Sequence, residues 1–117
     1  MLRSLCKSKI KNAIITGKNL KYDGSIGIDK KIIESADMVQ GEQVHVLNTM
    51  NGERFTTYII EEPAGSGNII LYGPAARLGE PGDEVVILTY CHIEAKEIHN
   101  FNMRVISLGK NNQCKTK

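Results

Sequence analysis

The sequence predicts a mainly β protein that folds as a small barrel with short helices. Short segments rich in β-branched and aromatic residues recur along the chain, and turn-forming pairs such as Asn51-Gly52 separate them. The chain has 117 residues, enough for one compact core, and we expect a single domain over residues 1–117. With 41% hydrophobic and 24% charged residues, the composition is that of a globular chain and excludes a disordered one.

Strand-like segments occur throughout the chain, and each is short and contains mainly Val, Ile, Leu, Thr, Phe or Tyr. In order, they are residues 13–16, 43–47, 55–60, 68–72, 84–90 and 104–108. Turn signals containing glycine separate many of the elements, at residues 23–24, 51–52, 65–67 and 81–83. Short strands joined by such turns are typical of a small barrel.

Two stretches have a helical pattern instead. In residues 29–36, Asp29 is a suitable N-cap. Apolar residues at helical spacing follow it, namely Ile32, Ile33 and Ala36. We expect a second short helix to begin near Pro74, and Gly79 and Pro81 to end it within about two turns.

Charge and hydropathy exclude several classes of partner. The formal net charge is +2, so no strong field would attract nucleic acid or an anionic membrane, and we expect neither as a partner. No apolar run approaches the roughly 20 residues that span a bilayer, and the Lys-rich start lacks the apolar core of a secretion signal. We therefore expect a cytoplasmic protein.

The polar, aperiodic tail of about residues 110–117 predicts disorder.

The cysteines and histidines do not form a recognisable metal or disulfide pattern. The three cysteines are odd in number and include no C-x-x-C pair, which argues against a disulfide framework and a structural zinc site. The histidines at 45, 92 and 99 lack the spacing of metal ligands. We therefore expect no metal.

The Asp23-Gly24-Ser25 string is the strongest functional signal in the chain. A glycine can adopt dihedrals closed to other residues, so we expect Gly24 to hold a distorted, exposed carbonyl beside the Ser25 hydroxyl. Attack by that hydroxyl would convert the amide to an ester, and elimination and hydrolysis would leave a pyruvoyl ketone at Ser25. Such a ketone forms a Schiff base with an amine and draws electrons from a breaking bond, which suits amino-acid decarboxylation.

An Asp-Gly-Ser string is also typical of an ordinary turn, so its neighbours matter. The chain from about residue 1 to residue 105 resembles the bacterial aspartate 1-decarboxylase family. Four segments carry the resemblance: Lys9 in the opening stretch, the LKYDGSIGID string at 20–29, NGERFTTY at 51–58, and GPAAR at 73–77. Their order and spacing together are highly specific.

The resemblance implies a fold, an assembly and a reaction. The fold is a six-stranded double-psi β-barrel, and cleavage between Gly24 and Ser25 yields a β chain of residues 1–24 and an α chain of 25–117. The processed chains form a homotetramer with sites at subunit interfaces. The enzyme is a carboxy-lyase that converts L-aspartate to β-alanine and carbon dioxide for pantothenate and coenzyme A. Its cofactor is the pyruvoyl group made from Ser25, with no metal and no pyridoxal phosphate. The sequence leaves open whether a separate maturation protein assists the cleavage.

The resemblance also assigns roles to single residues. Ser25 becomes the pyruvoyl group, and Tyr58 protonates the carbanion left when carbon dioxide departs. Thr57 holds the Gly24 carbonyl during self-cleavage and later contacts substrate. Two cations, Lys9 and Arg54, suit a substrate with two carboxylates, and the planar guanidinium favours bidentate binding.

The segment of Gly73, Pro74, Ala75 and Ala76 resembles the substrate loop of the family. Small residues there let backbone N–H groups approach an anion, and since proline has no N–H, Ala75 and Ala76 must donate. The usual family pattern is Asn-Gly-Ala-Ala-Ala, so Tyr72 and Pro74 are departures that bear on rate and substrate choice.

Two further expectations concern the faces of the strand with Thr57 and Tyr58 and the function of the chain. Strict alternation on a strand would put Thr57 and Tyr58 on opposite faces, so we expect a twist, a bulge or an interface to bring both to one site. The alternative function is an unprocessed, non-enzymatic β-barrel that serves as a binding or regulatory module. An intact bond between Gly24 and Ser25 in the mature protein would favour it.

Overall fold

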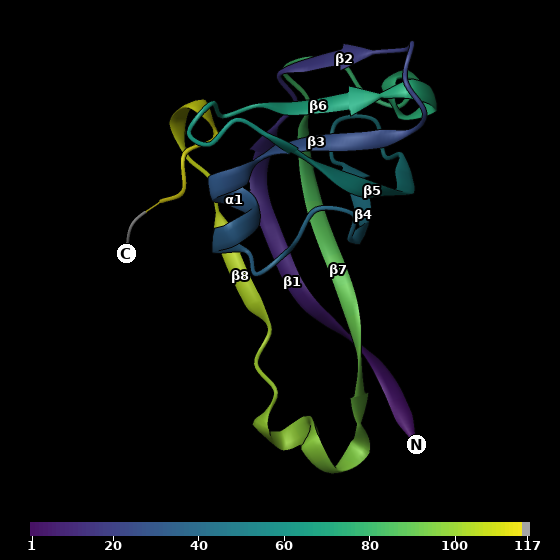
Figure 1. The fold of residues 1–117 in the computed structure, drawn as a ribbon, viewed down its shortest axis with the longest axis vertical. Helices are drawn as coiled ribbons and strands as arrows, with labels where there is room; N and C mark the ends of the chain where they lie inside the picture. Colours follow the sequence, from purple (N-terminus) through teal and green to yellow (C-terminus); the bar gives the residue numbers. More distant parts are fainter. Residues whose placement is uncertain (116–117) are drawn as a thin grey trace.

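Eight strands form a single mixed sheet in the computed structural model, which describes residues 1–115 (Figure 1). The strands are β1 (Leu2–Ile14), β2 (Gly17–Asn19), β3 (Ser25–Asp29), β4 (Gln43–Asn48), β5 (Arg54–Glu62), β6 (Ile69–Tyr72), β7 (Glu84–Glu94) and β8 (Arg104–Ser107). The helices are α1 (Lys30–Ser35) and the short 3-10 helices η1 (Gly73–Arg77), η2 (Ala95–Asn100) and η3 (Lys110–Asn112). The strand order is β2-β6-β3-β5-β4-β7-β1-β8.

The sheet closes into a barrel because β2 directly continues β1. After β1 has paired with β7, the Thr16 N–H donates to the Ile69 carbonyl at 2.8 Å, and β2 then pairs with β6. Counting β1 and β2 as one strand gives six strands around the barrel, with β8 added in parallel along β1. The predicted mainly β barrel with short helices is confirmed.

The interior of the barrel is filled mainly by isoleucine and valine. The largest fully buried side chains are Ile10, Ile15, Ile26, Ile28, Ile32, Ile33, Ile59, Ile69, Leu71, Ile87, Val44 and Val46. Burying each such side chain contributes about 1.5–3 kcal/mol to folding. Every residue of β3 is buried, so both faces of this strand, which lies between β6 and β5, are covered.

Helix α1 follows β3 immediately and begins where the sequence predicts. The carboxylate of Asp29 accepts the N–H of Lys31 at 2.8 Å and so caps the helix. The same carboxylate accepts the N–H groups of Gly65 and Gly67, at 2.9 and 2.8 Å. A carboxylate that is only 1% exposed is thus satisfied by three backbone donors, which link α1 to the loop before β6.

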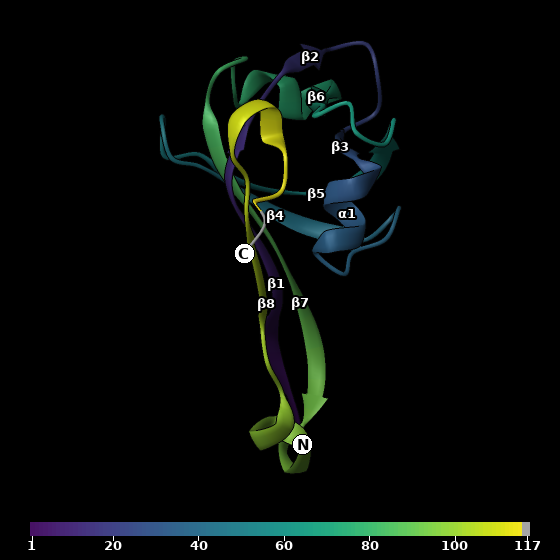
Figure 2. The same ribbon diagram turned by 90° about the vertical axis from the view of Figure 1, so that its left-hand side faces the viewer.

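Two strands extend beyond the sequence prediction and form an arm. β1 begins at Leu2, not at residue 13, and β7 continues to Glu94. Their antiparallel ladder, joined by β8 and η2, projects from one end of the barrel in both views (Figures 1 and 2), and the longest dimension is 43 Å. Lysines and serines interrupt the apolar pattern of residues 3–11, which is why composition alone did not indicate a strand there.

The prediction of a disordered tail from residue 110 is wrong for residues 110–115. η3 covers Lys110–Asn112, and Leu108 forms a β-bridge with Cys114. Asn112 is 2% exposed and is hydrogen-bonded to the backbone of Ile14 and Gly67. Composition does not indicate which polar side chains will hydrogen-bond to buried backbone groups, so it did not predict order here. Residues 116–117 of the predicted tail lie outside the described part of the chain.

Among residues 1–115, no helix is both long and apolar enough to cross a membrane.

Candidate active site

A cavity of about 340 Å³ opens beside the bond between Gly24 and Ser25. Its lining residues come from the turn before β3, the first half of β5, and η1 with the residue that follows it. They are Gly24, Phe55, Thr56, Thr57, Tyr58, Pro74, Ala75 and Leu78. The cavity therefore brings together predicted site residues from three separate sequence motifs. We call it the Gly24 pocket.

An open strand edge explains how adjacent residues of β5 line one pocket. The β4/β5 ladder runs from Gln43 opposite Tyr58 without a register shift, so no bulge is present in this pairing. On its other side β5 pairs with β3 only from Ile59 onward, opposite Ile26. The edge of Thr57 and Tyr58 therefore faces the pocket instead of a strand, and the expected bulge or twist is not needed.

The register of the parallel pair also places Ser25 relative to Tyr58. Ile26 opposite Ile59 is the first pair of this ladder, and Ser25 and Tyr58 each directly precede it on their strands. Ser25 is the first residue of β3 and is 1% exposed, whereas the side chain of Tyr58 is 43% exposed. The buried hydroxyl group and the exposed phenol thus lie at the same end of the strand pair.

Gly73, not Gly24, has the special backbone conformation at this site. Gly24 is not among the described glycines with positive φ, and a Cβ built on it would lie 3.5 Å from Pro74 Cδ, an ordinary contact. Gly24 therefore lacks the positive φ that favours glycine, and the expected distortion of its carbonyl stays a prediction. Gly73 has a φ of 64°, and a Cβ there would lie 2.2 Å from the Tyr22 carbonyl oxygen and 2.6 Å from the Gly24 nitrogen. Only glycine allows this close backbone packing.

Tyr72 is the one described residue near Ser25 whose titration is strongly perturbed. It lies opposite Ser25 in the antiparallel β3/β6 pair, and its hydroxyl donates to Glu62 Oε2 at 2.8 Å. Burial, followed by the hydrogen bond and the charge of Glu62, raises the pKa of Tyr72 to about 12. The hydroxyl therefore keeps its proton across the physiological pH range.

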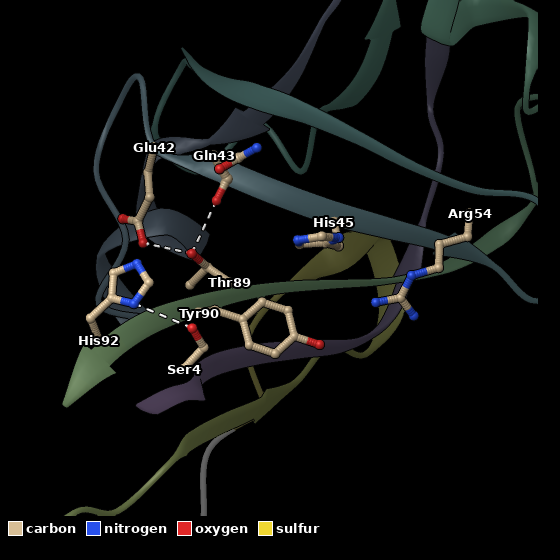
Figure 3. A pocket seen from close by; sticks show the side chains of 8 residues that line it. All are labelled: Ser4, Glu42, Gln43, His45, Arg54, Thr89, Tyr90 and His92. Atoms are coloured by element: carbon tan, nitrogen blue, oxygen red, sulfur yellow. Dashed lines mark hydrogen bonds between the residues drawn. The ribbon is translucent and has the colours of Figure 1, made fainter. Parts of the chain in front are cut away.

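Arg54 lies in a different hollow, of about 600 Å³, on the outer surface of β4, β7 and β1 (Figure 3). Its lining residues are Ser4, Glu42, Gln43, His45, Arg54, Thr89, Tyr90 and His92. The hydroxyl of Thr89 donates to Glu42 at 2.9 Å, and His45 packs edge-on against Tyr90 with ring centroids 5.1 Å apart. Within a single chain, Arg54 does not line the Gly24 pocket.

Four further predicted site residues line neither hollow. Ser25 is one of them: it is buried at the start of β3, next to the lining residue Gly24. Lys9 lies in β1 between Leu88 of β7 and Val105 of β8 and is half-buried. Gly73 is buried beneath the turn before Ser25, as described above. Ala76 is 1% exposed and belongs to the core. Of the predicted loop, Pro74 and Ala75 reach the pocket, and the loop forms the expected short helix as η1, in 3-10 form.

Sequence reasoning missed three residues of the pocket wall. Phe55 and Thr56 lie between the predicted Arg54 and Thr57, so the open edge of β5 accounts for them. Leu78 follows η1 directly, and its N–H donates to Ala75. The only local sequence feature that could have indicated Leu78 as a pocket residue is its position directly after a loop of small residues.

Within residues 1–115, no group of three or more His, Cys, Asp or Glu side chains is arranged to hold a metal ion.

The chain is similar to known proteins over nearly its whole length. A family model described as aspartate decarboxylase matches residues 1–115. A protein of Chlorobium phaeovibrioides named aspartate 1-decarboxylase is 50% identical over 113 residues, which cover 97% of this chain and 88% of that protein. A protein of the same name from Syntrophomonas wolfei is 45% identical over 115 residues, 98% of both chains. A third, from Ralstonia nicotianae, is 40% identical over 115 residues, 98% of this chain and 96% of that protein.

Proposed function

This chain belongs to the aspartate decarboxylase family of carboxy-lyases. From that membership we propose that it decarboxylates L-aspartate to β-alanine. The cofactor that we propose is a pyruvoyl group made from its own Ser25. The observation that carries the proposal is the Gly24 pocket. It lies at the Gly24–Ser25 bond and is lined by Thr57 and Tyr58, the hydroxyl-bearing residues that this chemistry needs.

The proposed self-cleavage uses only groups of this chain and water. The Ser25 oxygen attacks the Gly24 carbonyl carbon, the C–N bond breaks, an ester forms, and the hydroxyl proton moves to the freed amine. Loss of the Ser25 α-proton then expels the Gly24 carboxylate and forms a carbon–carbon double bond. Water hydrolyses the resulting enamine, releases ammonia and leaves the ketone. Thr57 supports the first step, since its hydroxyl can donate to the oxyanion that develops on Gly24.

The residues around Ser25 fit a pyruvoyl group. A ketone on the new chain end supplies the capacity to bind an amine and to draw electrons from the bond that releases carbon dioxide. We assign to Tyr58 the supply of the proton that replaces the lost carboxyl. In support, Tyr58 is partly exposed and lines the Gly24 pocket, and both it and Ser25 directly precede the first pair of the β3/β5 ladder. The small side chain of Ala75 leaves room for the substrate at the pocket wall.

We propose that the site is completed by a second copy of the chain within a tetramer. Aspartate carries two carboxylates, yet no Lys or Arg is among the described residues that line the Gly24 pocket. Arg54 lies in the separate outer hollow, and Lys9 lies on β1. A neighbouring subunit that presents Arg54 and Lys9 to the pocket would supply the missing charge and bind the carboxylates.

The decisive experiment is intact-mass spectrometry of the purified protein during incubation. We expect fragments of residues 1–24 and 25–117, with the larger one ending in a pyruvoyl group. Ser25→Ala should abolish both fragments. The chain contains a matched control, because Gly65-Ser66 is a second Gly-Ser pair in an exposed loop. Ser66→Ala should cleave at Gly24 like the wild type, and no cut should occur at Gly65.

An assay of β-alanine formation from L-aspartate by the processed protein completes the test. Activity that follows the cleaved fraction supports the proposal. A chain that stays intact and inactive contradicts unaided self-cleavage: it either needs a maturation protein or has lost the chemistry, and it favours the non-enzymatic barrel that serves as a binding module. A role in supplying β-alanine to pantothenate and coenzyme A and a cytoplasmic location are parts of the same proposal.

A further inference from the structure

The hydrogen bond between Tyr72 and Glu62 lies on the outer face of the barrel, next to the segment that precedes Ser25. Tyr72 ends β6, and Glu62 ends β5. The two strands are not neighbours, because β3 lies between them in the sheet. The side chains therefore meet across β3, and the distance from Tyr72 Oη to Glu62 Oε2 is 2.8 Å.

A glycine in β3 makes this bridge across the strand sterically feasible. Gly27 lies between the two side chains, opposite Ile60 on one side and Ile70 on the other. A Cβ on Gly27 would lie 2.2 Å from Glu62 Oε2 and 2.8 Å from its carboxyl carbon. The absence of a side chain at Gly27 therefore leaves the space in which the Glu62 carboxylate reaches Tyr72.

The other side of the Tyr72 ring contacts the segment before the cleavage bond. The rings of Tyr22 and Tyr72 pack edge-on with centroids 5.0 Å apart and an interplanar angle of 77°. Such a pair contributes beyond simple burial. The next residue, Gly73, packs its backbone against the carbonyl of Tyr22 and the nitrogen of Gly24. Tyr72 and Gly73 thus hold the segment Tyr22 to Gly24 at both ends.

We propose that Tyr72 is a positioning residue for self-cleavage at Gly24. Held by Glu62, its ring fixes Tyr22 and so the carbonyl that Ser25 attacks. A surface-exposed segment needs such support, because the Tyr22 side chain is 59% exposed and the turn around it has no regular secondary structure. Burial and Glu62 raise the pKa of Tyr72 to about 12, so its hydroxyl is a donor at neutral pH, which suits a permanent support. The inference rests on the proposed self-cleavage.

The primary test is the first-order rate of self-cleavage of Tyr72→Phe, followed by intact mass. This change keeps the ring against Tyr22 and removes only the donor to Glu62. We expect cleavage at least about tenfold slower than in the wild type, because a hydrogen bond to a charged group is worth about that factor or more. A wild-type rate would overturn the inference.

Four further variants separate the hydrogen bond from general disturbance. Glu62→Gln retains a side-chain oxygen that can accept from Tyr72 and should cleave within about threefold of the wild type, whereas Glu62→Leu should be as slow as Tyr72→Phe. The double variant Glu62→Leu with Tyr72→Phe should be no slower than either single change, because both remove one interaction. Tyr22→Phe keeps the ring pair and should cleave normally. Additive slowing in the double variant, or equal slowing of Tyr22→Phe, contradicts a specific role for the pair.

A measurement in an uncleavable chain keeps this inference separate from the proposed function. In the Ser25→Ala background, hydrogen exchange of the peptide that spans residues 18–25 should be faster with Tyr72→Phe than without it, by about tenfold at the protected amides. If the wild type never cleaves itself, the proposed function fails, yet the exchange result still decides whether Tyr72 supports the segment. Unchanged exchange would show that it does not.

Discussion

The side-chain amide of Asn112 hydrogen-bonds both peptide groups of Ile14: it accepts the N–H at 2.8 Å and donates to the carbonyl at 2.8 Å. The same NH₂ also donates to the carbonyl of Gly67 at 2.9 Å. One buried side chain near the C-terminus therefore ties the end of β1 to the loop before β6, which is where the barrel closes.

Replacing this amide should destabilise the whole fold. Asn112→Gly keeps the positive φ of 55° without strain but leaves three buried backbone groups without their partner. We expect the free energy of unfolding to fall by about 3 kcal/mol, measured by urea denaturation. Asn111→Gly is the matched control, because Asn111 has a φ of 57° but is exposed. Equal losses in the two variants would show that the backbone, and not the amide, matters.

Adding one methyl group at Gly73 should slow self-cleavage. Gly73→Ala forces a Cβ against the backbone of Tyr22 and Gly24, so we expect cleavage at least about tenfold slower and a loss of about 2 kcal/mol in stability, as for other overpacked sites. Gly82→Ala has a similar positive φ of 96°, but its Cβ would have nothing within 4 Å. It should lose only about 1 kcal/mol and cleave normally. The readouts are intact mass and thermal unfolding.

Removing the Tyr58 hydroxyl should affect turnover and not maturation. Tyr58→Phe retains the ring at the open edge of β5 but cannot supply a proton to the product. We expect kcat for aspartate to fall by about 100-fold or more, the usual size of a lost general acid. Intact mass must show complete processing in the same sample. A variant with normal kcat would rule out the phenol as the proton donor.

Mixing two inactive variants should restore activity if the site is shared between chains. Arg54→Ala and Tyr58→Phe each disable one side of the proposed site. When they are coexpressed and coassembled, we expect about one quarter of wild-type activity, because one random combination in four unites both intact residues. Each variant alone should stay near background. The absence of recovery in confirmed mixed tetramers would indicate that Arg54 and Tyr58 act from the same chain.

Acid should weaken the turn between η1 and β7 through Asp83. The Asp83 carboxylate accepts hydrogen bonds from the side-chain amide of Asn48 and from the backbone N–H of Glu80. These bonds, mainly the one from Asn48, hold the pKa of Asp83 below its usual value. A depressed folded-state pKa stabilises the fold above the unfolded value, and this contribution is lost as the pH falls through the folded one. Thermal unfolding at pH values from 6 down to 2 should therefore show a steeper acid loss for wild type than for Asp83→Asn. Parallel curves would exclude this linkage.

Elements with a strong local pattern were predictable from the sequence. β4, β5 and β6 have alternating or β-branched composition, and Asn51-Gly52 marks the turn between β4 and β5, where Gly52 has a φ of 79°. The N-cap of α1 at Asp29 was equally clear. β3 was missed because its SIGID string follows a turn signal and contains a glycine, and its strand character comes from burial between β5 and β6.

The site was predictable as a set of residues but not as an arrangement. Motifs indicated Gly24, Thr57 and Tyr58, and the fold brings them to one pocket. The open edge of β5 depends on where β3 begins, which no local pattern encodes. The contact of Tyr72 with Glu62 is of the same kind, because it joins two strands across a third. Long-range pairing of this sort follows from the register of the sheet, not from composition.

The continuity of β1 and β2 gives the proposed cut an unusual physical consequence. Both strands lie before Gly24, so cleavage would turn the first 24 residues into a separate peptide threaded between β7, β8 and β6. Melting would then also separate the two pieces of each subunit, and the midpoint temperature of the cut protein would rise more steeply with concentration than that of the uncut protein, in which each subunit remains one chain. Once separated, the two pieces would have to find each other by diffusion, so a brief heat shock that an uncleaved precursor survives could permanently inactivate the mature form.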